Sequence, residues 1–277
     1  MPELPEVETI RRTLAQLVAG ETIESVTVLL PKMVKKPLHT EAFADALAGE
    51  TIRSLGRRGK FLIFYTDHYA LVSHLRMEGR YRVYDQNEPV EKHTHMIFHF
   101  QSGKELRYKD VRKFGTMHLF LKGEELSSLP LSKLGPEPLS DAFTEKYLYG
   151  KLKKTERNIK TCLLDQTVIS GLGNIYVDES LFRAHIYPER KAKSLTKKDV
   201  HLLHSEIIQT LQEAVEKGGS TVRSYVNSQG QMGMFQLELY VYGRKGEPCR
   251  KCGTPIEKMV TAGRGTHYCP NCQKKRR

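Results

Sequence analysis

Cys249-Arg250-Lys251-Cys252 and Cys269-Pro270-Asn271-Cys272, separated by sixteen residues, determine how the C-terminal segment of this 277-residue chain folds. This spacing is typical of zinc sites with four thiolates, because each CxxC pair brings two sulfurs to one face of a tight turn. Disulfides are the alternative, but a cytosolic chain argues against them. We therefore expect Cys249, Cys252, Cys269 and Cys272 to hold one structural zinc ion, with no coordination position open for catalysis.

The segment around these cysteines is strongly basic. From Arg244 to Arg277, only Glu247 and Glu257 oppose a dense set of lysines and arginines. The whole chain has 44 Lys and Arg against 32 Asp and Glu, a net charge of +12 and an isoelectric point near 9.4. Such a balance favours a polyanionic partner, and nucleic acid more than a membrane. A protein that merely happens to be basic is the alternative.

Neither a membrane span nor a signal peptide is expected. The chain has no run of 18 apolar residues, and a helix that crosses a bilayer needs about that many. Its N-terminus lacks a basic region followed by an apolar run, so it does not resemble a secretory signal. We expect a cytoplasmic protein, with the fifth cysteine, Cys162, buried in an apolar core.

The N-terminal part is predicted to be a β-sandwich with a helix at its start. Val7, Ile10 and Leu14 recur at helical spacing within residues 6–19, and Gly20 ends the pattern. Runs rich in β-branched and aromatic residues, separated by turn signals, then predict strands. The predicted strands are residues 22–30, 61–66, 69–74, 80–84, 94–100, 105–108 and 116–120, with a short helix near residues 41–47.

The C-terminal part is predicted to be helical, so the fold class is α+β. A polar segment with several prolines and glycines, residues 122–140, separates the two parts. Predicted helices cover residues 142–153, 157–168, 175–184 and 199–217, and residues 235–242 are predicted to form a strand that leads into the zinc segment. The expected domains are a β-sandwich at 1–130, a linker at 131–140, a helical domain at 141–235 and a zinc segment at 236–277.

The chain begins Met1-Pro2-Glu3-Leu4-Pro5-Glu6. If Met1 is removed, Pro2 carries a free secondary amine, and an α-amino group has a pKa near 8. Such an amine can attack a masked aldehyde to form a Schiff base, here a cationic iminium. The plainer interpretation is that a small residue permits removal of Met1 and that proline is favourable at the start of a helix.

Three further motifs are suited to DNA. Gly171-Leu172-Gly173-Asn174 lies between two predicted helices, where backbone N–H groups and an amide could bind a phosphate, although Asn174 could be only a helix cap. Arg57-Arg58-Gly59-Lys60 could be a phosphate clamp, could supply a catalytic ammonium or could be a solvated turn. Two turns carry Met77, Arg112 and Phe114, side chains that could fill a hole in a base stack or could simply be core or surface residues.

These features together resemble the bacterial formamidopyrimidine-DNA glycosylase (Fpg) family along essentially the whole chain. Besides the N-terminal Pro-Glu and the four cysteines, the matching segments are residues 57–60, 74–79, 110–115, 134–139, 171–182 and 242–244. The resemblance implies a bifunctional DNA glycosylase and AP lyase of base excision repair. It would remove 8-oxoguanine and formamidopyrimidines from duplex DNA, with a helix-two-turn-helix and a β-hairpin zinc finger in its C-terminal part. We expect a monomer that associates with the nucleoid through DNA.

The resemblance also implies catalytic roles for four residues. Pro2 would attack C1′ and form the Schiff base, and Glu3 would protonate the sugar ring oxygen. Lys60 would serve β-elimination as a general acid/base and phosphate contact. Arg264, between the two cysteine pairs, would bind phosphate and serve δ-elimination.

Other residues would hold the DNA and the lesion. His93, Arg112 and Asn174 match positions that contact DNA, and Met77, Arg112 and Phe114 match the trio that fills the void and probes the opposite cytosine. The loop that closes over the flipped base would include Ser220 and Thr221, and Glu78 would also contribute to lesion binding.

The nearest alternative is the endonuclease VIII branch of the same superfamily, which prefers oxidised pyrimidines. That branch usually has Gly at the position of Leu4 and lacks the Met77, Arg112 and Phe114 combination. A non-enzymatic zinc protein that binds DNA is the alternative from another class, and it would not need Pro2, Glu3 and Lys60 together. One departure from the family is Glu156, which interrupts a basic run at 151–157 and puts individual phosphate contacts there in doubt.

Overall fold

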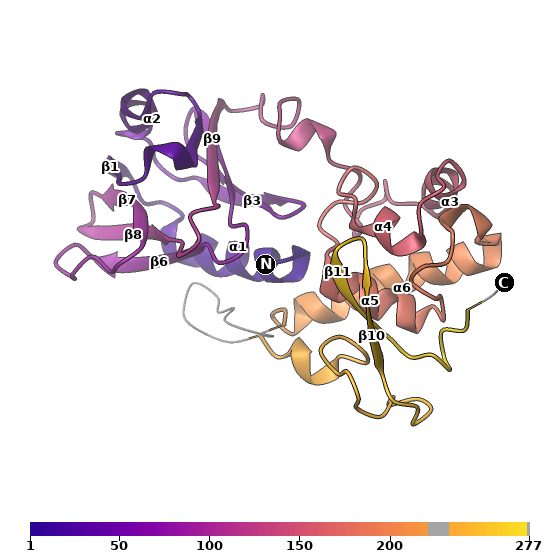
Figure 1. The fold of residues 1–277 in the computed structure, drawn as a ribbon. Helices are drawn as coiled ribbons and strands as arrows, with labels where there is room; N and C mark the ends of the chain where they lie inside the picture. Colours follow the sequence, from indigo (N-terminus) through magenta and orange to yellow (C-terminus); the bar gives the residue numbers. More distant parts are fainter. Residues whose placement is uncertain (221–232, 276–277) are drawn as a thin grey trace. The chain divides into compact units, whose positions relative to one another are not determined.

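The computed structural model describes residues 1–220 and 233–275. Within them the chain divides into two compact units, residues 1–133 and residues 134–220 together with 234–275. Figure 1 shows the elements of both units in chain order. Each unit has its own buried apolar core, so each is described by itself below.

The first unit begins with helix α1 (Leu4–Val18). Pro5 lies in its first turn, where a missing N–H costs no hydrogen bond. The helix begins two residues earlier than predicted because Glu6 Oε2 accepts a hydrogen bond from the backbone N–H of Glu3 (2.9 Å) and so satisfies a donor at the helix start. Its apolar face, as the spacing predicted, is buried.

Two sheets follow α1 and form the predicted β-sandwich. One has the order β1 (Ile23–Val28), β7 (Thr94–Phe100), β8 (Lys104–Lys109) and β6 (Arg80–Asp85). The other has the order β2 (Val34–Lys36), β9 (Thr116–Leu121), β5 (Tyr69–His74), β4 (Phe61–Tyr65) and β3 (Ser54–Arg58). Neighbouring strands are antiparallel, except that β2 and β9 are parallel. A 3₁₀ turn (Pro31–Met33) precedes β2, and helix α2 (Thr40–Leu47) lies between β2 and β3 in the chain.

Strand β3 was not predicted. Only Leu55 among its five residues is buried, and Gly56, Arg57 and Arg58 give it no alternating apolar pattern. Pairing with β4 nevertheless extends it through Arg58, so only Gly59 and Lys60 remain in the turn that was expected at 57–60. Cross-strand hydrogen bonding therefore overrides a weak local preference here.

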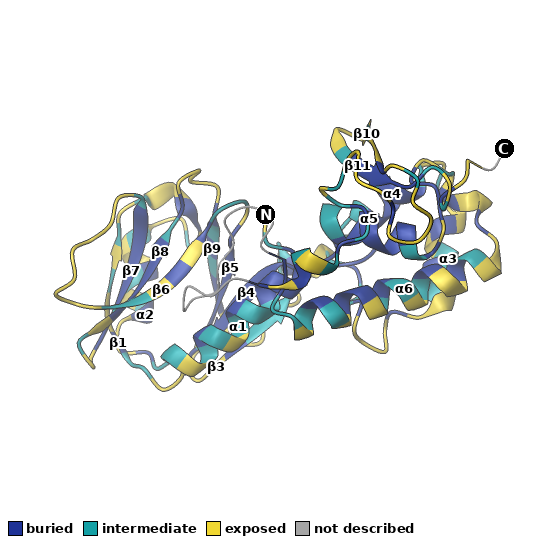
Figure 2. Ribbon diagram, turned by 90° about the horizontal axis from the view of Figure 1, so that it is seen from below, coloured by how far each residue is buried: buried dark blue, intermediate teal, exposed yellow. Residues whose placement is uncertain are grey.

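The second unit is helical, as predicted. Its helices are α3 (Glu145–Lys153), α4 (Ile159–Leu164), α5 (Asn174–Arg183) and α6 (Lys197–Glu216), with 3₁₀ turns at Leu131–Lys133 before it and at Ala192–Ser194 within it. Figure 2 shows α6 buried along one side and exposed along the other. Cys162 is 1% exposed in the core of this unit, which confirms the expectation for this residue.

Helix α4 is shorter than the predicted helix at 157–168. Asn158 Oδ1 accepts a hydrogen bond from the N–H of Thr161 (2.8 Å), so the helix begins only after Asn158. Asp165 Oδ1 accepts hydrogen bonds from both the N–H and the hydroxyl of Thr167 (2.9 and 2.7 Å), which turns the chain out of the helix.

The predicted strand at 235–242 is wrong. Residues 235–238 form a 3₁₀ turn (Phe235–Glu238) and the rest is irregular. The buried carboxylate of Glu179, on α5, accepts the backbone N–H groups of Tyr240, Val241 and Tyr242 (2.8, 2.9 and 2.9 Å). These donors therefore bond to a side chain instead of to a neighbouring strand.

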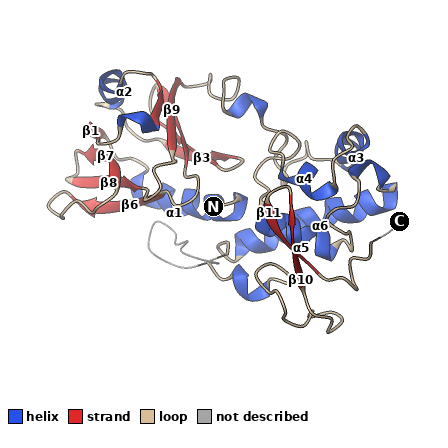
Figure 3. Ribbon diagram, viewed as in Figure 1, coloured by secondary structure: helices blue, strands red, loops and turns tan. Residues whose placement is uncertain are grey.

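A β-hairpin completes the second unit (Figure 3). Strands β10 (Glu257–Thr261) and β11 (Arg264–Tyr268) are joined by Ala262 and Gly263, which both have positive φ, as a tight two-residue hairpin turn requires. The α+β class, the N-terminal sandwich and the C-terminal helices with a hairpin are thus confirmed. None of the described helices is long and apolar enough to cross a bilayer.

Candidate active site and DNA-binding residues

Pro2 and Glu3 stand immediately before α1. Glu3 is only 3% exposed, whereas Pro2 is half-buried and Met1 is exposed. With Met1 in place, the Pro2 nitrogen is an amide and not an amine. The position of Glu3 at the helix N-terminus places a carboxyl group where the helix dipole favours negative charge.

A charge cluster ties α1 to the turn that carries Lys60. Glu8 accepts hydrogen bonds from Arg11 (2.8 Å) and from Arg57 on β3 (3.2 Å). Burial acts to raise the pKa of Glu8, but the hydrogen bonds and charges of the arginines outweigh it and lower this pKa to about 2. Arg57 also donates to the carbonyl of Gly59 (2.8 Å), which holds the turn just before Lys60. Lys60 is 5% exposed.

His74 lies at the end of β5, beside Lys60. Its ring packs edge to face against the ring of Phe61, the residue after Lys60, with 4.4 Å between the ring centroids. Burial, with the charges of Arg76 and Lys60, lowers the pKa of His74 to about 3. The neutral ring accepts a hydrogen bond at Nδ1 from the backbone N–H of Arg76 (2.9 Å), so its proton is on Nε2. No role was predicted for His74, because only its place before the Met77 turn marks it in the sequence.

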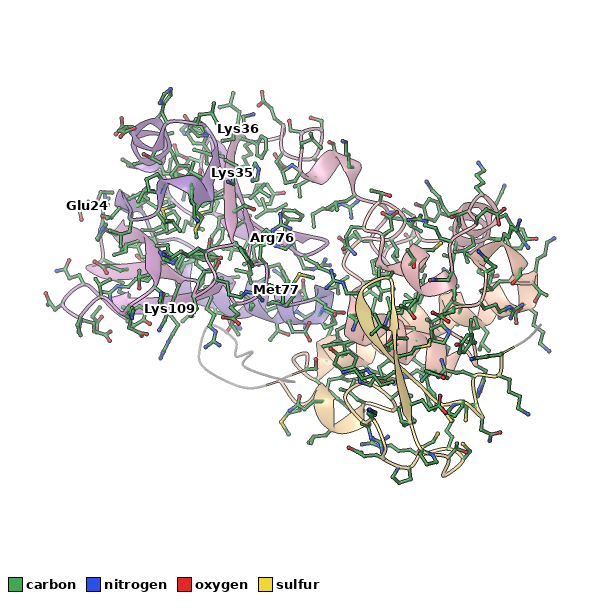
Figure 4. All side chains as sticks on the ribbon, in the orientation of Figure 1. Glu24, Lys35, Lys36, Arg76, Met77 and Lys109 are labelled. Carbon is green, nitrogen blue, oxygen red and sulfur yellow. The ribbon has the colours of Figure 1, made fainter. Side chains whose placement is uncertain are left out.

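Met77, labelled in Figure 4, lies in the turn between β5 and β6, and Glu78 follows it there. The turn closes with a hydrogen bond from the N–H of Gly79 to the carbonyl of Leu75 (3.0 Å), and Arg76 has a positive φ of 54°. Both Met77 and Glu78 are half-buried. The thioether is thus held on a short, closed turn instead of in a core.

Arg112 and Phe114 lie on a second turn that is organised by Asp110. The fully buried Asp110 carboxylate accepts the backbone N–H groups of Arg112, Phe114 and Gly115 (3.0, 2.8 and 2.9 Å). The Arg112 guanidinium lies over the Phe114 ring at 4.8 Å from its centroid, and Phe114 is 51% exposed. Asp110 begins the segment 110–115 that matches the family, but no role was predicted for it, although an Asp at the start of a turn is a recognisable signal.

His93 is attached to the same turn. It has a positive φ of 69°, and its carbonyl accepts the N–H of Asp110 (3.0 Å). His95, on β7, contacts the carbonyl of Asp110 through Nε2 (2.8 Å). In the first unit the structure therefore brings His93 next to the Arg112 turn, and Lys60 next to His74.

In the second unit, the glycine turn before α5 is held by Gln166. Its side chain accepts the N–H of Gly171 (2.9 Å) and donates to the carbonyl of Leu172 (2.8 Å). Asn174 is the first residue of α5, whose cap is Gly173, so Asn174 is not the helix cap. Its Nδ2 donates to the carbonyl of Gly265 (2.9 Å), directly after Arg264. Asn174 and Arg264 are thus neighbours in this structure.

Arg264 is exposed at the tip of the hairpin, where β11 begins. A buried ion pair contacts the backbone of this tip. Lys160 Nζ donates to Asp178 Oδ1 (2.6 Å) and to the carbonyl of Gly265 (3.2 Å). Asp178 Oδ2 accepts the N–H of His267 (2.9 Å). Neither Lys160 nor Asp178 was singled out from the sequence.

The four predicted zinc ligands come together. The sulfurs of Cys249, Cys252, Cys269 and Cys272 lie within 4.8 Å of one another. Three of the separations are 3.5, 3.6 and 3.9 Å, close to the edge of about 3.8 Å that a tetrahedron with Zn–S bonds of about 2.3 Å requires. The N–H groups of Lys251 and Cys272 point at the sulfurs of Cys249 and Cys269 (both 3.4 Å). The residues therefore fit one structural zinc ion.

Ser220 lies where the chain leaves α6 and is 3% exposed. Residues before and after positions 221–232 are hydrogen-bonded to each other. The backbone N–H of Met234 donates to the carbonyl of Lys217, and that of Phe235 to the carbonyl of Gly219 (both 3.0 Å). Thr221 lies outside the described residues.

Comparison with family models and with known relatives identifies the family of this chain. Residues 1–117 match the formamidopyrimidine-DNA glycosylase N-terminal domain, residues 134–226 its H2TH domain, and residues 246–275 a zinc finger found in FPG and IleRS. The formamidopyrimidine-DNA glycosylase of Bacillus licheniformis is 66% identical over 99% of this chain and 100% of its own length, and that of Bacillus subtilis is 61% identical over the whole of both chains.

Solved structures agree. A complex of Lactococcus lactis Fpg with DNA that contains an abasic site is 47% identical, with a TM-score of 0.93 over 99% of this chain and 100% of its own. A complex of a mutant form of the same lactococcal enzyme with Fapy-dG DNA is 46% identical, with a TM-score of 0.93 and the same coverage. The fold and site define a zinc-containing DNA glycosylase of base excision repair that also has AP-lyase activity. The chain belongs to the formamidopyrimidine-DNA glycosylase family.

Proposed function

We propose that this enzyme excises oxidised purines, such as 8-oxoguanine and formamidopyrimidines, from duplex DNA and cuts the strand through a Schiff base at Pro2. The observation that carries the proposal is that Pro2 directly precedes Glu3, a carboxyl group buried at the start of α1. An amine and an acid are thus adjacent once Met1 is removed. The lactococcal complexes with Fapy-dG and abasic-site DNA support the choice of substrate.

In the first step the Pro2 nitrogen attacks C1′ of the lesion nucleotide, and the bond between C1′ and the base breaks. The base leaves with the electron pair of that bond and takes up a proton. Glu3 gives a proton to the ring oxygen O4′, so the sugar opens and C1′ forms an iminium with Pro2. The iminium nitrogen carries no hydrogen, so it stays cationic and draws electrons from C2′.

Two eliminations follow. Loss of a proton from C2′ expels the phosphate on the 3′ side, and loss of a proton from C4′ then expels the phosphate on the 5′ side. Lys60, nearly buried beside the neutral His74, is the general acid/base and phosphate contact of the first elimination. Arg264, exposed at the hairpin tip next to Asn174, binds phosphate and serves the second.

The remaining residues hold DNA in the extruded state. Met77 and the stacked pair Arg112 and Phe114 fill the void that the flipped nucleotide leaves. His93 and Asn174 contact the DNA backbone, and Ser220, Thr221 and Glu78 contact the lesion base. Zinc, held by the four cysteines, has no catalytic position; it fixes the fold of the hairpin that carries Arg264.

A borohydride trap tests the proposal. The protein without Met1 is incubated with a duplex that contains 8-oxoguanine opposite cytosine, and a covalent adduct is expected that disappears in Pro2→Gly. Glu3→Gln should fold normally and bind the duplex but form little adduct. No adduct with the unaltered protein would exclude the lyase chemistry, and faster trapping on a thymine glycol duplex would favour the endonuclease VIII specificity.

We also propose that the enzyme works as a monomer in the cytoplasm, bound to the nucleoid. Its proposed parts are a catalytic sandwich at 1–130, a linker at 131–140, a helix-two-turn-helix domain at 141–235 and a zinc segment at 236–277. Limited proteolysis of the protein on and off DNA checks this division, because cleavage should begin between residues 122 and 140.

A further inference from the structure

The two turns that carry Met77 and the pair Arg112 and Phe114 rest on one buried side chain, Tyr108. Tyr108 belongs to β8 and its side chain is fully buried. A Cβ atom placed on Gly79 would lie 2.1 Å from the Tyr108 hydroxyl oxygen, and one placed on Gly115 would lie 1.9 Å from it. The hydroxyl therefore occupies the space that a side chain would need at both positions.

These two glycines are the last residues of the two turns. Gly79 closes the Met77 turn through its bond to the carbonyl of Leu75, and Gly115 closes the Arg112 turn through its bond to Asp110. Because the Tyr108 oxygen lies against both backbones at once, it sets how closely the two turns can approach. Glycine is required at both positions for this contact, whatever the φ angle is.

The Tyr108 hydroxyl does not contribute to the stability of the folded protein through a hydrogen bond within the described residues. It makes no hydrogen bond to any residue in 1–220 or 233–275, and a buried hydroxyl without a partner costs free energy that a phenylalanine would not cost. Burial raises the pKa of Tyr108, so the group stays neutral. The ring alone would pack equally well against Tyr81, whose ring centroid lies 4.9 Å away.

We propose that Tyr108 is a positioning residue whose hydroxyl holds the Met77 turn and the Arg112 turn at a fixed spacing, so that the three side chains enter the base stack as one wedge. The inference rests on the proposed function of Met77, Arg112 and Phe114. Without the hydroxyl, the turns can move toward each other, and the wedge no longer matches the void left by the flipped nucleotide.

Tyr108→Phe tests this, and Tyr81→Phe is its matched control. Tyr81 is the cross-strand partner of Tyr108 and is also buried, but its hydroxyl donates to Ser73 Oγ (2.8 Å) and is not among the three atoms nearest to a Cβ placed on either glycine. The substrate is an 8-oxoguanine·cytosine duplex with 2-aminopurine beside the lesion, whose fluorescence reports insertion of the wedge. A second duplex has a preformed abasic site, which needs no base to be extruded.

In Tyr108→Phe we expect an unchanged or higher melting temperature, and excision and the fluorescence change slowed about tenfold, since small misplacements have large effects on rate. Cleavage at the abasic site should stay close to that of the unaltered protein, and Tyr81→Phe should excise normally. Normal excision by Tyr108→Phe would overturn the inference, and so would an equal loss on both duplexes, which indicates a general structural defect. Met77→Ala separates the two proposals. If Met77→Ala leaves the fluorescence change intact, Met77 does not enter the base stack and the proposed function of the three side chains is wrong. If Met77→Ala reduces the fluorescence change but Tyr108→Phe does not, Tyr108 has no positioning role.

Discussion

Lys160 Nζ lies 2.6 Å from Asp178 Oδ1, and both side chains are completely buried. The pair joins α4 to α5, and its remaining hydrogen-bonding capacity reaches the zinc hairpin through the carbonyl of Gly265 and the N–H of His267. A buried ion pair gives little net stability, but loss of one partner leaves an uncompensated charge. The ion pair thus connects the hairpin tip that presents Arg264 to the helices, and replacing only one of its two residues should lower the stability of the protein.

Asp178→Asn is therefore expected to destabilise the protein by about 3–5 kcal/mol, because it removes the carboxylate charge that faces the buried Lys160 ammonium. Urea denaturation of the zinc-loaded protein measures this loss. The double variant Lys160→Met with Asp178→Leu should recover most of the stability, since neither charge of the pair then remains. A loss below about 1 kcal/mol in Asp178→Asn would show that water reaches the pair.

Asp110→Asn should act on the first unit in a similar way. The amide offers one oxygen in place of the two that accept the N–H groups of Arg112, Phe114 and Gly115. We expect a loss of about 1–3 kcal/mol in stability, the cost of a buried donor left unpaired, and slower excision because the Arg112 turn loosens. Asp85→Asn, at an exposed position on β6, is the control for the change of charge. Equal behaviour of the two variants in denaturation and single-turnover assays would contradict the role of Asp110.

The sequence predicted the elements whose signals are local. Three such signals are the apolar spacing of α1, Thr196 before α6 with Gly218-Gly219 after it, and the two cysteine pairs; each specifies structure within a short segment. It failed where a contact outside the segment decides. The side chain of Glu179 accepts the N–H groups of residues 240–242, and backbone pairing with the next strand, β4, makes a strand of Arg57 and Arg58. The same holds for the site, because Asp178 pairs with Lys160 on another helix and the Tyr108 hydroxyl lies against Gly79 on another turn.

Removal of zinc is expected to unfold the hairpin while the first unit stays folded. The four thiolates join the two ends of the segment that contains the hairpin, and structural zinc contributes directly to folding. Cys252→Ser should lose the metal, measured by atomic absorption, and should bind duplex DNA much more weakly. Cys162→Ser is the matched control, since Cys162 lies in the helical core and should leave one zinc ion per chain. A Cys252→Ser protein that binds DNA normally would separate the zinc from DNA binding.

The stability of the protein should fall in mild acid because of His74. The folded state holds this ring neutral, with a pKa lowered from 6.5 to about 3, so between these values the unfolded chain binds the proton and the folded chain does not. The contribution of His74 is therefore fully present above about pH 6.5 and is lost as the pH falls toward 3, by about 1.5 kcal/mol between pH 6.5 and 5. Thermal melts across this range measure the slope, and His74→Gln should flatten it. An identical slope in His74→Gln would assign the acid sensitivity to other groups.

Arg264→Ala should weaken DNA binding and selectively slow the second strand cut. Arg264 is exposed at the hairpin tip, next to the carbonyl that Asn174 and Lys160 both contact, so its loss should remove the proposed phosphate contact and leave the hydrogen bonds of that carbonyl in place. The slope of log affinity against log salt should become shallower by about 1. Gel analysis of the cleaved strand should show the product of β-elimination accumulating before δ-elimination. Lys245→Ala is the control, because it removes the same charge from an exposed position of the zinc segment outside the hairpin. If both variants lower δ-elimination equally, the effect belongs to the net charge of the segment and not to Arg264.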